Sequence, residues 1–208
     1  MKRYIKIKVS NLLGGSSNLD KILKLNFDNS AFGSTGEEKL FKKHNNSPMT
    51  FGTLMQEGLD NIINLYKNNI DSELVNKNFI DLGSGDGRVP IWASMYGFKN
   101  SNGIELSTKR HNIALENLKK INKKNINFYN YDMFDHNINQ YDLMYISSLC
   151  FSDELLEQLG IKLDNEAKQN SMIVSSKEIP LKNFKRIEPI TIGQSWDNDS
   201  SGYVYIKN

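Results

Sequence analysis

The chain has 208 residues, of which 38% are hydrophobic and 24% charged, a composition typical of a globular protein that buries one sizeable core. The charges of its 26 basic and 24 acidic residues nearly cancel, so the net charge does not indicate a nucleic-acid partner. The single cysteine, Cys150, cannot form an internal disulfide, and no apolar run is long enough to cross a membrane. We therefore expect a soluble, intracellular protein.

The N-terminal part of the chain predicts a small extension. Ile5, Ile7 and Val9 alternate with lysines, as in a short strand with one buried face. A segment of this size is too small to form an independent core. We expect residues 1–45 to pack on a larger domain that covers residues 46–208.

Helix and strand patterns then alternate. A helix of about four turns is predicted from Thr53, with Met55 on its buried face. Further predicted helices cover residues 87–95, 107–121 and 152–163, and predicted strands cover residues 78–82, 102–106, 126–131, 141–146, 171–176, 184–192 and 202–206. This alternation predicts an α/β protein with three layers, in which helices cover a mainly parallel, seven-stranded, Rossmann-like sheet. The last two strands lack a helix between them and predict an antiparallel hairpin at one edge.

A glycine-rich turn follows the first strand of this series. The segment 79–87 reads Phe-Ile-Asp-Leu-Gly-Ser-Gly-Asp-Gly, with Asp81 at the strand end and glycines at Gly83, Gly85 and Gly87. Glycine permits a tight turn and a close approach between backbone and ligand. A strand before the turn and a helix after it are the context that a nucleotide-binding site needs. An ordinary glycine-rich turn is the alternative interpretation.

The charges around this turn indicate which cofactor it binds. The glycine spacing is G-x-G-x-G rather than the G-x-G-x-x-G of dinucleotide-binding proteins, and Asp81 and Asp86 would repel a pyrophosphate. A cofactor that carries an ammonium and a sulfonium suits these carboxylates. The sequence therefore predicts S-adenosyl-L-methionine as the cofactor.

Acidic residues at the next two strand ends extend the predicted site. Glu105 stands where nucleotide-binding α/β proteins place an acceptor for the ribose hydroxyls. Asp132 can accept a hydrogen bond from the adenine amino group, with Met133 or Phe134 covering the ring. The alternatives are a solvated strand end for Glu105 and a surface turn for Asp132. His136 lies nearby, but no pair of residues has metal-ligand spacing, so no metal is expected.

Several separated segments, in order along the chain, resemble the disruptor-of-telomeric-silencing histone lysine methyltransferases, a class without a SET domain that acts on nucleosomes. They are residues 47–53 (Ser-Pro-Met-Thr-Phe-Gly-Thr), residues 81–85 in the glycine turn, residues 146–151 (Ile-Ser-Ser-Leu-Cys-Phe), residues 173–177 (Ile-Val-Ser-Ser-Lys), and Ser195-Trp196 followed by Tyr203. The last two lie in regions that generic methyltransferases do not share. The resemblance implies a class I methyltransferase fold.

The resemblance also implies roles for particular residues. The loop of residues 47–53 closes over the methionine end of the cofactor, and its cofactor contacts are Thr50, Phe51, Gly52 and Thr53. A narrow aromatic channel for a lysine side chain is lined by Phe151, Trp196 and Tyr203, and Ser147 lies beside both the cofactor and the amine. The implied substrate is a histone lysine in a nucleosome, which would place the protein in the nucleus.

Two departures from that family keep other interpretations open. Ser147 replaces the first Asn of the family's Asn-Asn pair, and Phe51-Gly52-Thr53 replaces Tyr-Gly-Glu. The alternatives are a methyltransferase of the same fold that acts on another protein or a small molecule, in the cytoplasm, and a cofactor-binding protein without catalysis. The basic stretch at 119–124 offers a weak DNA contact or a solvated helix end.

Overall fold

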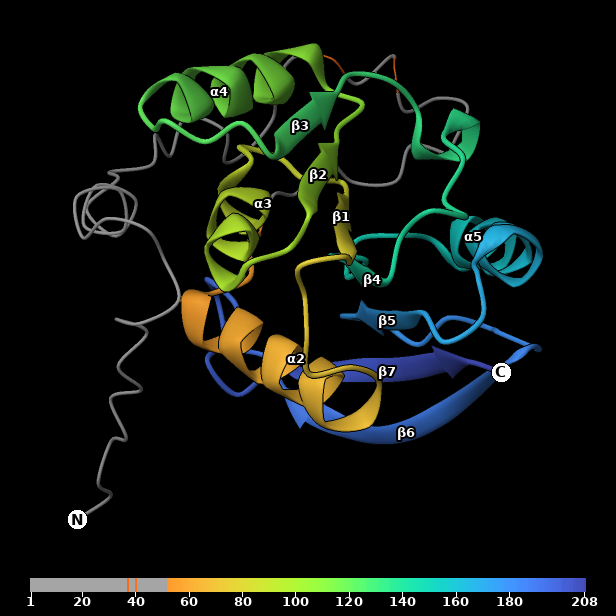
Figure 1. The fold of residues 1–208 in the computed structure, drawn as a ribbon. Coiled ribbons are helices and arrows are strands. Elements are labelled where there is room, and N and C mark those ends of the chain that lie inside the picture. Colours follow the sequence, from red (N-terminus) through yellow and green to blue (C-terminus); the bar gives the residue numbers. More distant parts are fainter. Residues whose placement is uncertain (1–36, 38–39, 41–51) are drawn as a thin grey trace.

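The structure is a computed structural model that describes residue 37, residue 40 and residues 52–208 (Figure 1). The strand predicted near the N-terminus and the boundary predicted after residue 45 lie outside the described residues. Thr50 and Phe51 lie outside them as well. Of the predicted cofactor loop, the structure describes Gly52 and Thr53.

Helices and strands alternate along the described chain until the final hairpin. In order, the elements are α2 (Gln56–Asn69), β1 (Asn78–Leu82), α3 (Arg88–Ala93), η3 (Ser94–Tyr96), β2 (Asn100–Ile104), α4 (Thr108–Lys119), β3 (Ile126–Tyr129), η4 (Met133–Asp135), β4 (Leu143–Ile146), α5 (Asp153–Glu166), β5 (Met172–Ser175), β6 (Phe184–Thr191) and β7 (Ser201–Lys207).

These strands form one seven-stranded sheet of order β3-β2-β1-β4-β5-β7-β6. The pairs from β3 to β5 are parallel, whereas β7 is antiparallel to both β5 and β6. The predicted edge hairpin is therefore confirmed. The chain reverses its direction of winding between β1 and β4, and in open α/β sheets ligands bind at the carboxyl ends of the strands that flank such a point.

Helices cover both faces of the sheet, which gives three layers (Figure 1). On one face, α2 and α3 pack on strand residues such as Phe79 and Tyr145, and α4 lies beside α3. On the other face, α5 packs on alternate strand residues such as Ile80 and Ile146. The strand side chains are buried on both faces, which explains the continuous apolar run of β4.

Several predicted boundaries differ from the structure by two or three residues, and the starts of α2 and β2 are two of them. Met55 precedes α2 as its N-cap residue and is 41% exposed, so it is not on the buried face of the helix. Strand β2 begins at Asn100, two residues before the predicted start at 102, because its polar side chains have partners inside the protein. Ser101 Oγ donates to the Pro90 carbonyl at 2.6 Å, and Asn102 Nδ2 donates to the Phe79 carbonyl at 2.9 Å. Buried polar groups of this kind are tolerated when they are hydrogen-bonded.

Candidate active site

The glycine turn lies at the carboxyl end of β1, beside β2. The backbone N–H groups of Gly83 and Ser84 both donate to the Ile104 carbonyl at 2.9 Å, which fixes the turn against the neighbouring strand. Gly87 has φ of +78° at the start of α3, where a Cβ would lie only 2.5 Å from Phe128 Cζ. Side chains are excluded there by backbone conformation and by packing.

Glu105 is held by the same turn. Its carboxylate accepts hydrogen bonds from the backbone N–H of Gly85 at 2.9 Å and of Ser107 at 2.8 Å. Burial raises the pKa of the Glu105 carboxyl, while these two donors and the Arg110 guanidinium act in the opposite direction. Glu105 is therefore a structural brace for the turn as well as the predicted ribose acceptor. The sequence motif predicts only the contact with the ribose and gives no sign of the hydrogen bonds to the turn.

Asp81 is the carboxylate nearest the end of β1, and it is only 3% exposed. Its Oδ1 atom has no hydrogen-bond partner among the described residues. Burial, reinforced by the Glu105 and Asp86 carboxylates, raises the pKa of the Asp81 carboxyl well above its usual range. An unpaired buried acceptor is costly, and a cationic ligand group is the partner that would relieve this cost.

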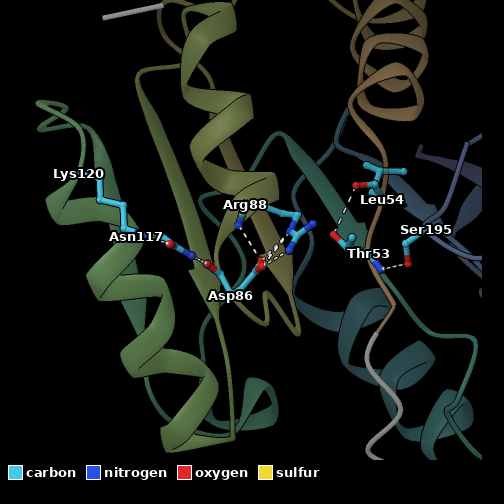
Figure 2. Close-up of polar contacts among 7 residues, drawn as sticks. All are labelled: Thr53, Leu54, Asp86, Arg88, Asn117, Lys120 and Ser195. Atoms are coloured by element: carbon cyan, nitrogen blue, oxygen red, sulfur yellow. Dashed lines mark hydrogen bonds and ion pairs between the residues drawn. The ribbon is translucent and has the colours of Figure 1, made fainter. Parts of the chain in front are cut away.

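Asp86 has a different role from the one that the sequence suggested. Its buried carboxylate forms an ion pair with Arg88, whose Nε donates at 2.8 Å and whose Nη2 is also in contact (Figure 2). The Asp86 carbonyl accepts from Asn117 Nδ2 of α4 at 3.0 Å. Asp86 therefore ties the glycine turn to two helices, and its charge is already balanced by Arg88. Of the two aspartates of the motif, Asp81 is the one that suits a cationic cofactor.

The loop after β3 holds the predicted adenine contacts. Asp132 is buried, and its Oδ1 accepts from the Phe134 backbone N–H at 3.0 Å, which caps η4. Met133 packs against the apolar cluster under α5. The imidazole of His136 contacts the hydroxyl of Tyr141 at 2.7 Å through Nε2, and Nδ1 contacts Tyr131. No metal-binding group of acidic, histidine and cysteine side chains occurs among the described residues.

Two of the segments that carried the family resemblance meet at the ends of β4 and β5. Ser148 Oγ lies 2.6 Å from Ser175 Oγ and accepts from the Lys177 backbone N–H at 2.9 Å. Lys177 Nζ donates to the Phe151 carbonyl at 2.9 Å. Ser148, the second serine of the Ser147-Ser148 pair, thus links segment 146–151 to segment 173–177 by hydrogen bonds. Ser147 itself is only partly buried.

Two other segments of the resemblance meet beside β7. The Thr53 backbone N–H donates to Ser195 Oγ at 3.2 Å, and the Ser195 N–H donates to the Thr53 carbonyl at 2.8 Å (Figure 2). Trp196 lies against Gly52, where an added Cβ would overlap the indole ring. The loop between β6 and β7 is therefore fastened to the segment that enters α2.

The residues predicted to line an aromatic channel are not all in one cluster. Phe151 and Tyr203 both pack on the apolar cluster under α5. Trp196 lies outside that cluster and is 46% exposed. Arg186 lies over the Tyr203 ring, with Cζ 5.0 Å from its centroid. The described contacts thus place Phe151 and Tyr203 against the same apolar cluster and Trp196 against Gly52.

The strand order and the helices on both faces of the sheet are those of the class I methyltransferase fold, whose cofactor is S-adenosylmethionine. Residues 81–186, just over half of the chain, match the family described as the ANTKMT methyltransferase domain. The chain belongs to this family. The matched family is thus not the disruptor-of-telomeric-silencing family, and membership of the latter is not confirmed.

Solved structures share the fold at low sequence identity. An RNA methyltransferase from Salinibacter ruber in complex with S-adenosyl-L-homocysteine has a TM-score of 0.54 and 18% identity, over 71% of this chain and 92% of that one. An S-adenosylmethionine-dependent methyltransferase from Aquifex aeolicus has a TM-score of 0.50 and 14% identity, over 72% and 88%. A mutant of MtNAS in complex with S-adenosylmethionine has a TM-score of 0.56 and 9% identity, over 91% and 71%. No curated protein matches the sequence significantly.

Proposed function

We propose that this methyltransferase is a protein-lysine N-methyltransferase. The observation that carries the proposal is the match of residues 81–186 to the ANTKMT methyltransferase domain, which is a protein-lysine methyltransferase domain. The matched residues include the carboxylates Asp81, Glu105 and Asp132 and the segment that contains Ser147. They therefore cover the predicted contacts at the ends of β1 to β5, whereas Thr50 to Thr53, Trp196 and Tyr203 lie outside the matched range.

The residues at this edge of the sheet fit the charges of S-adenosylmethionine. Asp81 would receive the ammonium, since its Oδ1 meets no donor within the described residues. Glu105 would still accept from the ribose, because each of its oxygens receives one N–H and keeps a further lone pair. Asp132 would receive the adenine amino group. When bound, the cofactor supplies a methyl group on a positively charged sulfur.

The acceptor side must desolvate an amine and hold it in line. A lysine amine has a pKa of about 10.4 in water, so most of it is protonated and unable to attack at neutral pH. Burial against apolar side chains lowers that pKa by disfavouring the charge. Phe151 and Tyr203 are the apolar groups for this role, and the Ser147 hydroxyl would accept a hydrogen bond from the amine. Positioning then supplies most of the rate.

The protein substrate is proposed from the sequence resemblance alone, which favours a histone lysine in a nucleosome. A DNA contact through the basic stretch at 119–124 belongs to the same proposal. In the structure, Lys119 pairs with Glu116 at 2.6 Å and Lys120 donates to Asn117 at 2.9 Å. Lys123 Nζ donates to the Ser94 carbonyl at 3.3 Å. A DNA contact would therefore compete with intramolecular partners for three of these lysines.

The proposal is tested by transferring a labelled methyl group. The protein is incubated with methyl-labelled S-adenosylmethionine and, in separate reactions, nucleosomes, the same histones without DNA, a protein extract and total RNA. We expect label in protein that survives nuclease, is lost on proteolysis and is recovered as methyl-lysine after hydrolysis. More label on nucleosomes than on free histones would support the DNA contact.

Two results would contradict the proposal. Label found only in RNA would identify a nucleic-acid methyltransferase of the same fold. Binding of the cofactor without formation of S-adenosylhomocysteine in any reaction would identify a binding protein that lacks catalysis. An Asp81→Asn variant, expected to bind the cofactor more weakly, is the control that assigns any label to this site.

A further inference from the structure

The side chain of Tyr145 lies in the centre of the sheet, next to the predicted cofactor site. Tyr145 is on β4, and its register partners are Asp81 on β1 and Val174 on β5. Directly paired residues of neighbouring strands project from the same face of a sheet. The ring of Tyr145 belongs to the apolar cluster under α2 and is 1% exposed. The sequence predicted only that this residue lies in the strand 141–146.

The hydroxyl of Tyr145 does not fit a purely apolar role. It has no hydrogen-bond partner in the part of the chain that the structure describes. Burial raises the pKa of this hydroxyl, and the nearby Asp81 carboxylate raises it further. The hydroxyls of Ser147 and Ser176 act in the opposite direction and lower this pKa, although the Tyr145 hydroxyl lies outside hydrogen-bond geometry with every described residue. These serines follow the ends of β4 and β5, so the phenol is directed toward the carboxyl edge of the sheet.

An unpaired buried hydroxyl calls for a ligand or a bound water. Burial of an unpaired hydroxyl is unfavourable, and phenylalanine would fill the same apolar position without this penalty. Asp81 Oδ1, on the paired strand, is likewise without a hydrogen-bond partner among the residues described. One unpaired donor and one unpaired carboxylate oxygen thus occur on adjacent strands. Together they are complementary to a zwitterion, with its ammonium at the carboxylate and its own carboxylate at the hydroxyl.

We propose that the Tyr145 hydroxyl binds the cofactor by donating a hydrogen bond to the carboxylate of its amino-acid end, while Asp81 receives the ammonium. The inference rests on the methyltransferase class and is independent of the methyl acceptor. A phenol that remains neutral is suited to this role, because a second negative charge beside Asp81 would repel the ligand's carboxylate. Tyr145 would therefore distinguish ligands that carry an amino-acid end from those that carry only the nucleoside.

The test is the conservative substitution Tyr145→Phe, which removes the hydroxyl and keeps the ring. Binding is measured by calorimetry for two ligands, S-adenosylhomocysteine and 5′-methylthioadenosine. Both carry an adenosine and a thioether, but only the first has the amino-acid end. We expect the affinity for S-adenosylhomocysteine to fall roughly tenfold, as for a lost hydrogen bond to a charged group. The affinity for 5′-methylthioadenosine should not change.

Tyr66→Phe is the matched control. Tyr66 is fully buried in the same apolar cluster, and its hydroxyl also has no hydrogen-bond partner within the described residues. Tyr66 lies on α2. Burial is the main cause that raises the pKa of its hydroxyl, and the carboxylates that raise it further are Asp142 and Asp71 rather than Asp81. We expect this variant to bind both ligands as the unmodified protein does. Thermal melts without ligand should show no loss of stability in either variant, since no intramolecular hydrogen bond is removed.

Several results would overturn the proposal. An unchanged affinity for S-adenosylhomocysteine in Tyr145→Phe would mean that the hydroxyl does not touch the ligand. An equal loss for both ligands would mean that the substitution disturbs the nucleoside site instead. A lower melting temperature with unchanged binding would assign the hydroxyl to a bound water inside the core. None of these measurements includes a methyl acceptor, so they are independent of whether lysine is the substrate.

Discussion

The proposed active site has a cofactor side, which is the glycine turn with Glu105, and an acceptor side, which comprises the ends of β4 and β5 and the β6–β7 loop. The two sides differ in how far apart in the sequence the contacting residues lie. In the glycine turn, Gly85 and its acceptor Glu105 are 20 residues apart, and Asp86 pairs with Arg88 within the same turn. Beside β7, Thr53 and its acceptor Ser195 are 142 residues apart. Ser148 and Ser175, at the ends of β4 and β5, are 27 residues apart.

This difference has a physical consequence for the two functions. On the cofactor side, the glycine turn is held by hydrogen bonds from residues 20 to 31 positions away in the chain, such as Gly85 to Glu105 and Asn117 to Asp86. The acceptor side exists only after β7 has paired with β5 and the β6–β7 loop has joined the segment before α2. We therefore expect substitutions on the acceptor side to affect turnover and those in the turn to affect binding or folding. Three experiments examine this separation, and they are ordered by the size of the expected effect.

The largest effect is expected from Trp196→Ala. If the indole ring helps to hold the lysine side chain, turnover should fall about 100-fold or more, because positioning supplies much of the rate. Affinity for S-adenosylhomocysteine should change little, since Asp81 and Glu105 are intact. Stability should also change little, because Trp196 is 46% exposed. The measurements are steady-state kinetics, calorimetry and a thermal melt on the same preparation.

Two other outcomes for Trp196→Ala would contradict the assignment of the β6–β7 loop to the acceptor side alone. If Trp196→Ala lost binding and turnover to the same degree, the β6–β7 loop would belong to the cofactor site. Marked destabilisation would instead show that the indole and Gly52 form part of the fold. Raising the pH should restore some turnover if deprotonation of the amine has become limiting.

Asp81→Asn should change binding and stability in opposite directions. Loss of a charged acceptor should weaken cofactor binding by about 10- to 100-fold. Burial raises the pKa of the Asp81 carboxyl above its value of 3.8 in the unfolded chain. The folded protein therefore binds the proton more tightly, and this contribution to stability is lost as pH rises through the folded-state pKa. The variant without ligand should become the more stable protein over that range.

Melting temperatures of both proteins between pH 4 and pH 8, without ligand, test the sign of this effect. Calorimetry in buffers of different ionisation enthalpy gives a second readout, because the ammonium favours the ionised carboxylate. Cofactor binding should release a proton from the unmodified protein and not from Asp81→Asn. Tighter binding by the variant, or a variant that loses stability as pH rises, would remove Asp81 from the proposed ammonium site.

A comparison of two glycines separates backbone strain from packing in the turn. Gly87→Ala combines a left-handed conformation with a Cβ 2.5 Å from Phe128 Cζ, so we expect a loss of about 2–4 kcal/mol of stability. Gly83→Ala has a similar φ, of +91°, but nothing within 4 Å of the added Cβ, so only about 1–2 kcal/mol should be lost. Denaturant unfolding of the two variants measures the difference. Equal losses would show that packing against Phe128 contributes nothing.

Much of the cofactor side could be predicted from the sequence. β1 was predicted with its observed ends, and the glycine turn follows it as expected, whereas Glu105, predicted at the end of a strand over 102–106, directly follows β2. The failures have particular causes. Strand β2 was placed two residues late because Asn100 and Ser101 are polar, and their burial depends on partners in other elements. Met55 was assigned to a helix face although it precedes the first turn.

The sequence by itself determined the α/β alternation, the edge hairpin and the acidic, glycine-rich cofactor turn, because each is encoded by residues that are neighbours in the chain. Only the tertiary structure decided which carboxylate of that turn is neutralised, since the Arg88 partner of Asp86 is a matter of side-chain geometry. It also brought segment 146–151 to segment 173–177, and Thr53 to Ser195. Finally, it left the Tyr145 hydroxyl unpaired beside Asp81 among the described residues. Local patterns encode backbone conformation and amphipathic faces, whereas hydrogen-bond partners across a sheet are fixed only when the strands have paired.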